Sequence, residues 1–572
     1  MDDFSVREIP FSHPGAWFGI SPVTALATYA DDLHLVSHRN GMHAVLSLVP
    51  LAVDGPVDVT ADPASLTWTA GRGRAGAAFE SPSALRISGH GLGMRIAAAD
   101  RTLTPFTGTY FFHDRVTSSY VFTSYETGHR YRVTVLSGRF DVVGATALGT
   151  ADRAVVIGEG GGEWELVLEE LTTARAAFSS DATFTEVVAA ARRSFERFTD
   201  AVAPWRGDRT PAAELACYVL WSATVAPAGF VKRPAVLMSK HWMDKVWSWD
   251  HCFNAVALAA GAPELAWDQL QVVFDHQTEE GALPDSITHA EVLHNFVKPP
   301  IHGWAVSRLR ERLPGGLPSA ELPRLYRQLA AWTTFWLDHR RVPGELFPHY
   351  EHGNDSGWDN STVFREQGLV QTADLAAFLV VQLRELARLA GEIGDPAAAA
   401  RWTREADTML AGMLDRLWNG ARFTSRPLDG TPRTTASLLD LVPVVLGAEL
   451  PADVHAEVAA AVAAHLTPVG LATELPDSPW YEADGYWRGP VWAPSTVLIE
   501  DGLRRGGAVA LADEVSASFR AVCEKSGFAE NFDALTGQGL RDRAYTWTAS
   551  AYLLLAGDAE RRLLEGPGAG DE

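Results

Sequence analysis

The sequence predicts two structural parts, an all-β sandwich at the N-terminus followed by an all-α (α/α)6 barrel. Short apolar runs between Gly, Asp and Pro fill the first part, and a helical period of three to four follows it. A chain of 572 residues also exceeds the size of one hydrophobic core. We therefore expect a sandwich over 1–183, a linker helix over 184–209, a barrel over 210–562 and a disordered tail over 563–572.

The β part is indicated by runs such as LHLVS, HAVLSLVPLAV, SYVFTSY and YRVTVLSG. Many short strands separated by turn residues are typical of a β-sandwich. The segment FTEVVAAARRSFERFTDAV then changes to the helical period, which predicts the linker helix.

The rest of the chain is predicted to be helical. Apolar periodicity and Gly or Pro stops delimit about twelve segments, a number that fits an (α/α)6 barrel. No fixed repeat length is visible, which disfavours the alternative of an α-solenoid. The segments are expected to begin near Pro211, Asp250, Pro263, Pro299, Ala320, Val370, Asp395, Thr434, Ala452, Gly489, Val509 and Ala544.

Composition excludes several classes of function. The net charge of −23 disfavours binding to nucleic acid or to an anionic membrane. The three cysteines form no CxxC pair, so neither a zinc site nor a disulfide framework is predicted. The start MDDFSVREIP lacks the features of a signal peptide, and no stretch approaches 18 apolar residues. We expect a soluble cytoplasmic protein without metal or cofactor, and its oligomeric state stays open.

Nineteen tryptophans point to a ligand class, because many stand beside acids and glycines in predicted loops. Sugars suit such surroundings, since their C–H faces stack on rings while their hydroxyls need hydrogen-bond partners. One such segment is WSWDHCFN, in which Trp247 and Trp249 precede Asp250. These tryptophans favour a sugar subsite in which Asp250 accepts hydrogen bonds. The alternative is that Asp250 is only the N-cap of a helix.

The segment HYEHGNDSGWDNS contains the first candidate for a catalytic carboxyl group. Asp359 follows Trp358, and an indole next to an acid desolvates it and raises its pKa. A general acid must hold its proton near neutral pH, so this environment suits that role. Asp355 is the rival candidate, and a turn role for both residues is the remaining alternative.

Two further segments complete the set of candidates. Glu530 stands beside aromatic residues in FAENFDALTGQG, where a glutamate suits a general base acting on water, whereas Asp533 is expected in a turn. Arg488 in YWRGPVW is expected to bind a substrate hydroxyl or to keep a catalytic carboxylate ionised, with a structural ion pair as the alternative. Glycoside hydrolysis needs one protonated and one ionised carboxyl group, and this part of the chain supplies candidates for both.

Taken as an ordered set, WSWDHCFNA, KPPIHGWAV, NDSGWDNS, YWRGPVW and ENFDALTGQGL resemble segments of glycoside hydrolase family 63. The resemblance extends from 247 to 549 and implies an (α/α)6 barrel and hydrolysis with inversion. It implies Asp359 as general acid and Glu530 as general base. It further implies that the sugar is bound by Trp247, Asp250, His302, Trp304, Trp358, Trp487 and Arg488.

The predicted function is hydrolysis of a terminal α-glycosidic bond in a small carbohydrate substrate, with an α-glucosidase preferred. The alternatives are an α-mannosidase or a glycosylglycerate hydrolase on the same scaffold, a disaccharide phosphorylase, and a non-catalytic sugar-binding protein. Glu530 disfavours the phosphorylase, which needs a basic phosphate site in its place. The presence of both carboxyl groups disfavours the binding protein.

Overall fold

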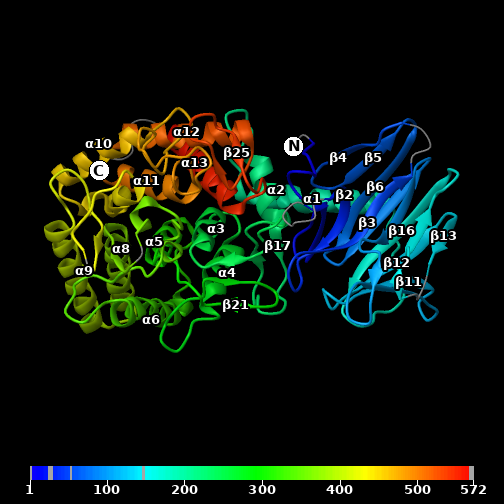
Figure 1. Ribbon diagram of the computed structural model, residues 1–572, viewed down its shortest axis with the longest axis horizontal. Coiled ribbons are helices and arrows are strands. Elements are labelled where there is room, and N and C mark those ends of the chain that lie inside the picture. Colours follow the sequence, from blue (N-terminus) through cyan, green and yellow to red (C-terminus); the bar gives the residue numbers. More distant parts are fainter. Residues whose placement is uncertain are drawn as a thin grey trace. The chain divides into compact units, whose positions relative to one another are not determined.

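A computed structural model describes residues 3–23, 30–51, 55–144, 148–366, 368–428 and 430–565. The chain divides into two compact units. The first, here the β unit, comprises Met1–Ala201, Cys217–Lys245 and Thr288–Glu291. The second, here the helical unit, comprises Val202–Ala216, Val246–Ile287 and Val292–Glu572. Figure 1 colours the strands of the β unit blue to cyan and most helices of the helical unit green to red.

Two antiparallel sheets form the β unit. The six-stranded sheet has the order β1 (Phe18–Val23), β2 (Ala30–Ser37), β3 (His43–Leu51), β8 (Gly93–Ala98), β15 (Ala154–Ile157) and β13 (Phe140–Val143). The eight-stranded sheet has the order β10 (Thr109–Asp114), β11 (Ser119–Ser124), β12 (Arg130–Ser137), β16 (Glu163–Leu171), β7 (Ala84–His90), β6 (Gly73–Ser81), β5 (Leu66–Ala70) and β4 (Asp58–Ala61). Two short pairs join β9 (Thr102–Leu103) to β14 (Gly149–Thr150) and β17 (Thr224–Val225) to β18 (Ala235–Val236).

The two sheets bury aromatic and aliphatic side chains between them. Phe18 of β1 contacts Phe79 of β6 with ring centroids 5.3 Å apart. Phe111 of β10 and Phe122 of β11 stack on each other at 4.4 Å, and both are fully buried. Such alternate inward side chains are what the period of two along each strand predicts. The N-terminal part of the chain is therefore β-rich, as expected from its short apolar runs.

The border between the units differs from the border predicted near residue 210. Helix α1 (Phe184–Val202) belongs almost entirely to the β unit, and α2 (Ala213–Ala223) is divided between the two units. Residues 217–245 and 288–291 also belong to the β unit, although they stand inside the predicted barrel. Local periodicity predicts helices and strands but contains no information on which unit a segment packs against.

In the helical unit, six helices contact one another in a closed circuit. The order is α3 (Asp250–Leu258), α5 (His302–Arg312), α8 (Ala373–Glu392), the 3₁₀ segment η3 (Leu438–Glu449), α11 (Ala493–Arg505), α13 (Thr546–Glu565), and α3 again. Other helices pack on members of this circuit: α4 (Pro263–Phe274), α6 (Leu322–His339), α9 (Pro396–Arg416), α10 (Ala452–His465) and α12 (Val509–Ser526).

Short elements occupy the loops of the helical unit. They are η1 (Ser319–Glu321), α7 (Gly353–Ser356), η2 (Thr362–Phe364), β19 (Val246–Trp247), β20 (Ser286–Ile287), β21 (Val292–Leu293), β22 (Val370–Gln371), β23 (Arg426–Pro427), β24 (Asn531–Phe532) and β25 (Gly539–Leu540). Each predicted helix begins within four residues of an observed one, the largest differences being Gly489 against Ala493 and Thr434 against Leu438.

The predicted tail is corrected at its start, because residues 563–565 form the last turn of α13. The rest of that predicted tail, 566–572, lies outside the described residues. Within the part of the chain that the structure describes, no helix has the length and apolar character needed to cross a membrane.

A glycine sets the distance between two helices of the circuit. The backbone nitrogen of Gly303 in α5 donates to the side-chain oxygen of Gln382 in α8 at 3.1 Å. A Cβ atom at position 303 would lie 2.3 Å from the Cα of Gln382, so no side chain fits there. The neighbouring helices can be this close only because residue 303 has no Cβ.

We predict that Gly303→Ala lowers the free energy of unfolding by about 1–3 kcal/mol, the usual cost of overpacking a core. The matched control is Gly391→Ala on α8, where a Cβ would meet no atom within 4 Å. That control should be neutral or stabilising by about 0.5–1 kcal/mol, because alanine is the better helix former. Urea unfolding of both variants measures the difference, and equal stabilities would contradict the argument.

Candidate active site

The candidate residues come from loops that precede helices of the circuit. Asp250 is the first residue of α3, Asp359 precedes α8, and Glu530 precedes α13. Asp250 stands in the first turn of its helix, where the helix dipole favours negative charge, whereas Asp359 and Glu530 lie in longer loops.

Asp250, Asp285 and Asp359 form one group around Lys298. The Lys298 ammonium lies 3.1 Å from a carboxylate oxygen of Asp285 and donates to the carbonyl of Asn354 at 2.6 Å. The charges of Asp285 and Lys298 act on both Asp250 and Asp359, and the Asp359 charge acts on Asp250. Burial raises the pKa of Asp250 well above its usual range, and it also raises the pKa of Asp359, while Lys298 opposes both shifts.

A small sheet holds this group in register. Strand β19 pairs with β20 so that Trp247 stands opposite Ser286, next to Asp285. The Ser248 backbone nitrogen donates to the Asp285 carbonyl at 3.3 Å. Lys298 also lies 5.4 Å from the centre of the Trp247 ring, within the range of a cation–π contact. Lys298 thus connects Trp247 with the group that contains Asp250.

The N-cap alternative for Asp250 is wrong. Trp249 occupies the N-cap position of α3, and no side chain makes a capping hydrogen bond there. Asp250 instead stands in the first turn of the helix, 4% exposed. Its carboxyl group has no hydrogen-bond partner in another residue among those described, which leaves it available to a ligand.

Glu530 is the second buried carboxyl group and lies within the electrostatic influence of Asp359. Its backbone nitrogen donates to the Asp542 carbonyl at 2.7 Å, beside the pair β24–β25. Burial and the adjacent Asp542 raise the pKa of Glu530 to about 8, whereas Arg541 and a hydrogen bond from the Tyr486 hydroxyl oppose the shift. Both Glu530 and Asp359 act on the Tyr486 hydroxyl and raise its pKa, in addition to burial.

Tyr486 and Arg541 are held in rare backbone conformations, with φ of 63° and 61°. The Arg541 guanidinium carbon lies 4.9 Å from the centre of the Tyr486 ring. Its nitrogens also contact Asn531 at 3.0 Å and the Asp484 carboxylate at 2.7 Å. Non-glycine residues in this region are strained by about 1–3 kcal/mol each and concentrate at functional sites.

Trp358 and Trp487, which the resemblance assigns to the sugar pocket, lie in a stack of buried indoles. Trp487 stacks on Trp492 at 4.1 Å with an angle of 7°, and Trp358 lies 4.6 Å from Trp487. Trp249 approaches Trp487 at 6.4 Å and Trp547 at 5.8 Å. The exposed fractions of Trp358 and Trp487 are 2% and 1%, so these rings mainly support the loops that contain the acids.

The loop that contains Asp359 makes two other contacts with its neighbours. Asn360 accepts a hydrogen bond from the Trp487 backbone at 2.9 Å and donates to the Gly485 carbonyl at 3.0 Å. Gly357 has φ of 73°, and a Cβ there would lie 2.5 Å from the Trp249 ring. Asp359 is therefore fixed between the tryptophan stack and the loop that contains Tyr486.

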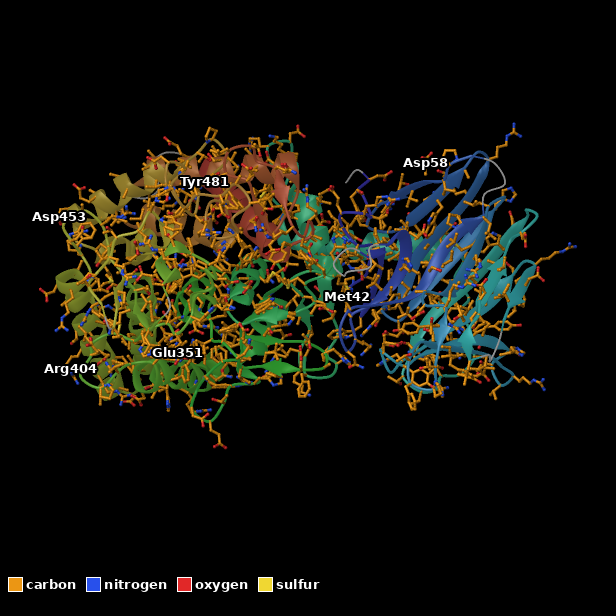
Figure 2. All side chains as sticks on the ribbon, in the orientation of Figure 1. Met42, Asp58, Glu351, Arg404, Asp453 and Tyr481 are labelled. Carbon is orange, nitrogen blue, oxygen red and sulfur yellow. The ribbon has the colours of Figure 1, made fainter. Side chains whose placement is uncertain are left out.

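Asp355 and Asp359 have different surroundings. Asp355 is 1% exposed and accepts hydrogen bonds from Arg340 at 2.9 Å and from the backbone nitrogens of Val297, Glu351 and His352. Arg340 also pairs with Glu351, whose side chain lies at the surface (Figure 2). The Asp359 carboxyl group, in contrast, bonds to no other side chain among the described residues. The geometry favours Asp359 over Asp355 as a group free to react.

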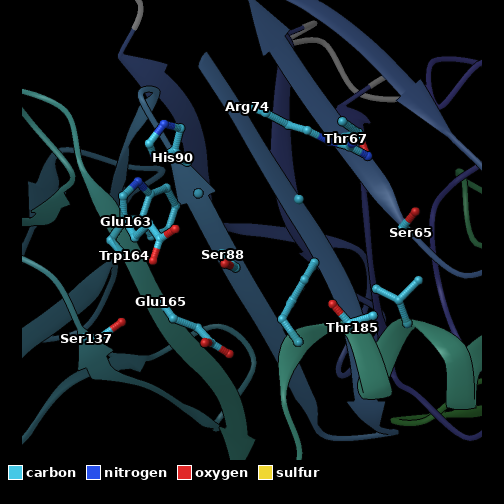
Figure 3. A pocket seen from close by; sticks show the side chains of 14 residues that line it. Ser65, Thr67, Arg74, Ser88, His90, Ser137, Glu163, Trp164, Glu165 and Thr185 are labelled. Atoms are coloured by element: carbon cyan, nitrogen blue, oxygen red, sulfur yellow. The ribbon is translucent and has the colours of Figure 1, made fainter. Parts of the chain in front are cut away.

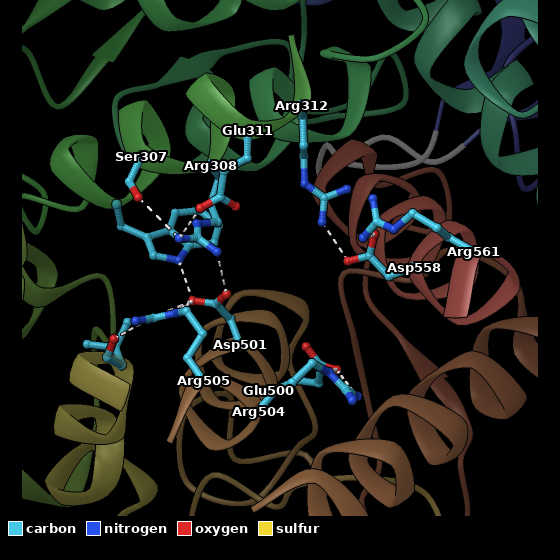
Figure 4. Close-up of polar contacts among 12 residues, drawn as sticks. Ser307, Arg308, Glu311, Arg312, Glu500, Asp501, Arg504, Arg505, Asp558 and Arg561 are labelled. Atoms are coloured by element: carbon cyan, nitrogen blue, oxygen red, sulfur yellow. Dashed lines mark hydrogen bonds and ion pairs between the residues drawn. The ribbon is translucent and has the colours of Figure 1, made fainter. Parts of the chain in front are cut away.

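Three predicted wall residues have other contacts. His302 is fully buried and lies 3.0 Å from the Ser248 carbonyl, and burial lowers its pKa to about 4. The Trp304 indole donates to Asp501 at 3.0 Å, which also pairs with Arg308 and Arg505 (Figure 4). Arg488 pairs with the exposed Glu482 at 2.8 Å, which is the alternative considered from the sequence.

Several residues of the group were missed from the sequence. Asp285, Asp542 and Arg541 stand in segments without tryptophan next to an acid, so the pattern that indicates Asp359 does not indicate them. Lys298 and Tyr486 stand inside the segments KPPIHGWAV and YWRGPVW, in which only neighbouring residues are predicted to bind the sugar.

The fold and the buried acid pairs together define a helical glycoside hydrolase. The family described as the mannosylglycerate hydrolase MGH1-like glycoside hydrolase domain matches residues 243–548. The chain belongs to this family, within glycoside hydrolase family 63.

Two named mannosylglycerate hydrolases match a little more than half of the chain. The mannosylglycerate hydrolase of Rubrobacter radiotolerans is 26% identical over 406 residues, 54% of this chain and 89% of the relative. A solved mannosylglycerate hydrolase of Thermus thermophilus has a TM-score of 0.52 at 22% identity, over 60% of this chain and all of that one. A bacterial glucoamylase covers 98% of this chain and 94% of its own, with a TM-score of 0.60 at 10% identity. The likeness in fold to the glucoamylase therefore extends over both units.

We predict that Asp355→Asn and Asp359→Asn have opposite effects on stability. Asn at 355 breaks the buried ion pair with Arg340 and should lower the free energy of unfolding by about 3–5 kcal/mol. Asn at 359 replaces a group whose raised pKa makes its ionised form unfavourable in the folded protein, so stability at neutral pH should stay equal or rise. Urea unfolding at pH 7 tests both, and a large loss in Asp359→Asn would indicate a structural role for that residue.

Proposed function

We propose that the helical unit is an (α/α)6 barrel and that the chain is an inverting hydrolase of α-glycosidic bonds. We also propose that the two sheets of the β unit form a sandwich. The closed circuit of six helices with others packed outside it supports the barrel. The observation that supports the chemistry best is that two buried carboxyl groups from separate loops, Asp359 and Glu530, both act on the Tyr486 hydroxyl.

In this proposal Asp359 is the general acid. Burial raises its pKa, which favours the protonated form that a general acid needs in order to donate to the glycosidic oxygen. Asp250 and Trp247 lie on the same side of the group and would bind the sugar ring, with Asp250 accepting hydrogen bonds from ring hydroxyls. Lys298 offsets part of the negative charge that the three aspartates concentrate there.

Glu530 is the proposed general base, which removes a proton from the attacking water. This role requires the ionised form, and a pKa of about 8 leaves that form a minority at pH 7. Arg541 and the Tyr486 hydroxyl favour ionisation, and their strained backbone fixes them beside Glu530. Activity should therefore increase as the pH rises toward 8.

The proposed substrates are small α-glycosides, and glycosides of a hydroxy acid are preferred among them. This preference rests on relatives that are named mannosylglycerate hydrolases and that match 54% of this chain. The α-glucosidase predicted from the sequence is the second candidate. Release of free sugar from mannosylglycerate, glucosylglycerate and a set of α-glucosides and α-mannosides, with and without phosphate, compares these functions directly.

We expect Asp359→Asn and Glu530→Gln each to lower kcat at least about a hundredfold on an unactivated glycoside. On a glycosyl fluoride, whose leaving group needs no proton, Asp359→Asn should regain much of its activity and Glu530→Gln should not. The matched control is Asp533→Asn, because Asp533 accepts hydrogen bonds from Leu535 and Thr536 in a turn. Rescue of Glu530→Gln by the fluoride, but not of Asp359→Asn, would reverse the two roles.

The pH profile of the native enzyme tests the same roles. The limb of kcat/KM that rises with pH should reflect deprotonation of Glu530, with an apparent pKa near 8. In Glu530→Gln with the fluoride substrate this limb should be absent. A rising limb that persists in that variant would assign it to another group.

The stereochemistry of the product is the other expected outcome. An inverting enzyme places a water between base and sugar, so an α-linked substrate releases the β-anomer first. Proton NMR in the first minutes of hydrolysis distinguishes the anomers before they equilibrate. First appearance of the α-anomer would mean retention and would exclude Glu530 as a base acting on water.

A further inference from the structure

A groove crosses the outer face of the eight-stranded sheet in the β unit (Figure 3). Its cavity has a volume of about 530 Å³ and is bounded on one side by the first turns of α1. Ligand cavities usually measure about 300–1,000 Å³, so the groove has the size of a binding site. All the residues that line it belong to the β unit.

The floor of the groove is a row of polar and small residues that are direct cross-strand neighbours. From β12 to β5 the row is Ser137, Glu165, Ser88, Gly76 and Thr67. Neighbouring strands lie about 4.8 Å apart, so the row extends over roughly 19 Å, and Ser137, Glu165 and Ser88 present polar side chains on three adjacent strands of it. Short side chains in the middle keep the floor low.

Beside this row, the groove contains charged groups that the protein itself leaves free. Glu163 stands opposite His90, and among the described residues neither side chain has a hydrogen-bond or ion-pair partner. Arg74 contributes donors on the same side and contacts only Thr67, at 3.4 Å. On the other side the Phe184 ring lies over Gly76, where a Cβ would come within 3.3 Å of it.

The rest of this sheet face also presents charged side chains, but the segment 172–183 packs against them. Arg132 pairs with Glu169 and donates to the carbonyls of Arg175 and Ala176 at 3.0 and 2.8 Å. Arg86 pairs with Glu165 and donates to the carbonyl of Ala182 at 3.2 Å. The segment 172–183 thus satisfies the polar groups of the covered part. Within the groove, Glu165 is already paired with Arg86, and Glu163 and His90 are the charged or titratable groups that face solvent without a partner among the described residues.

We propose that this groove is an accessory binding site for a neutral oligosaccharide, separate from the hydrolytic chemistry of the helical unit. Hydroxyl groups both donate and accept, so they match a row of serine, threonine and carboxylate groups with one guanidinium nearby. The Phe184 ring offers an apolar surface for the C–H face of a sugar. Two carboxylates in the groove and the net charge of −23 disfavour an anionic ligand.

The test is calorimetric binding of maltoheptaose and of mannopentaose to the full chain. Asp359→Asn is present in every protein compared, so that hydrolysis is suppressed and the catalytic group is the same throughout. Glu163→Gln removes a free carboxylate from the groove, and Ser88→Trp fills its floor. The matched control is Asp141→Asn, which removes an exposed carboxylate from β13 of the other sheet.

We expect at least one oligosaccharide to bind, with its Kd raised at least about tenfold by Glu163→Gln, the usual effect of losing a hydrogen bond to a charged group. Ser88→Trp should abolish that binding, and Asp141→Asn should leave it unchanged. With Asp359 restored, the groove variants should keep native kcat on a small glycoside. The proposal is overturned if neither oligosaccharide binds at about 10 mM, well above the Kd of a weak site. It is also overturned if Glu163→Gln, verified as folded by circular dichroism, binds as tightly as the control.

Discussion

The helical unit depends on a group of buried carboxyl groups gathered around one lysine. Burial is the main cause of the raised pKa values of Asp250 and Asp359, and the neighbouring aspartates add to it. Lys298 opposes both shifts, but one cation does not balance the charges of Asp250, Asp285 and Asp359. Burial of carboxyl groups costs folding free energy, and the raised pKa that results is the property a general acid needs.

The elements around the acids stabilise their loops without an unpaired charge. Trp487 stacks on Trp492, and Asn360 is hydrogen-bonded to the neighbouring loop. The carboxylate of Asp355 is paired with Arg340. Strain is confined to Tyr486 and Arg541, whose positive φ angles place a hydroxyl and a guanidinium beside Glu530. A rigid apolar frame with a few strained polar groups is the arrangement expected of a preorganised site.

The positions of the helices and of three of the buried acids could be predicted from the sequence. The helix starts follow from local period and Gly or Pro stops, and Asp250, Asp359 and Glu530 stand in segments whose mixture of acids and aromatics is unusual. What the sequence did not predict depends on contacts between distant segments. Lys298 becomes part of the group because β19 pairs with β20, and Trp304 turns toward Asp501 because α5 packs near α11. No local pattern contains those pairings, nor does one show that Arg488 pairs with Glu482 or that His302 contacts the Ser248 carbonyl.

The extent of the β unit also depends on contacts between segments that are distant in sequence. Residues 217–245 and 288–291 belong to it although they stand between helices of the other unit in sequence. Two of the segments that leave it continue into the acid group: Val246–Trp247 leads to Asp250, and the hairpin 285–294 contains Asp285 at its base. Hydrogen bonds of His289 with Asn40 and Arg39 fix the tip of that hairpin within the β unit. Two of the loops that contain acidic groups are thus covalently continuous with strands and turns of the β unit.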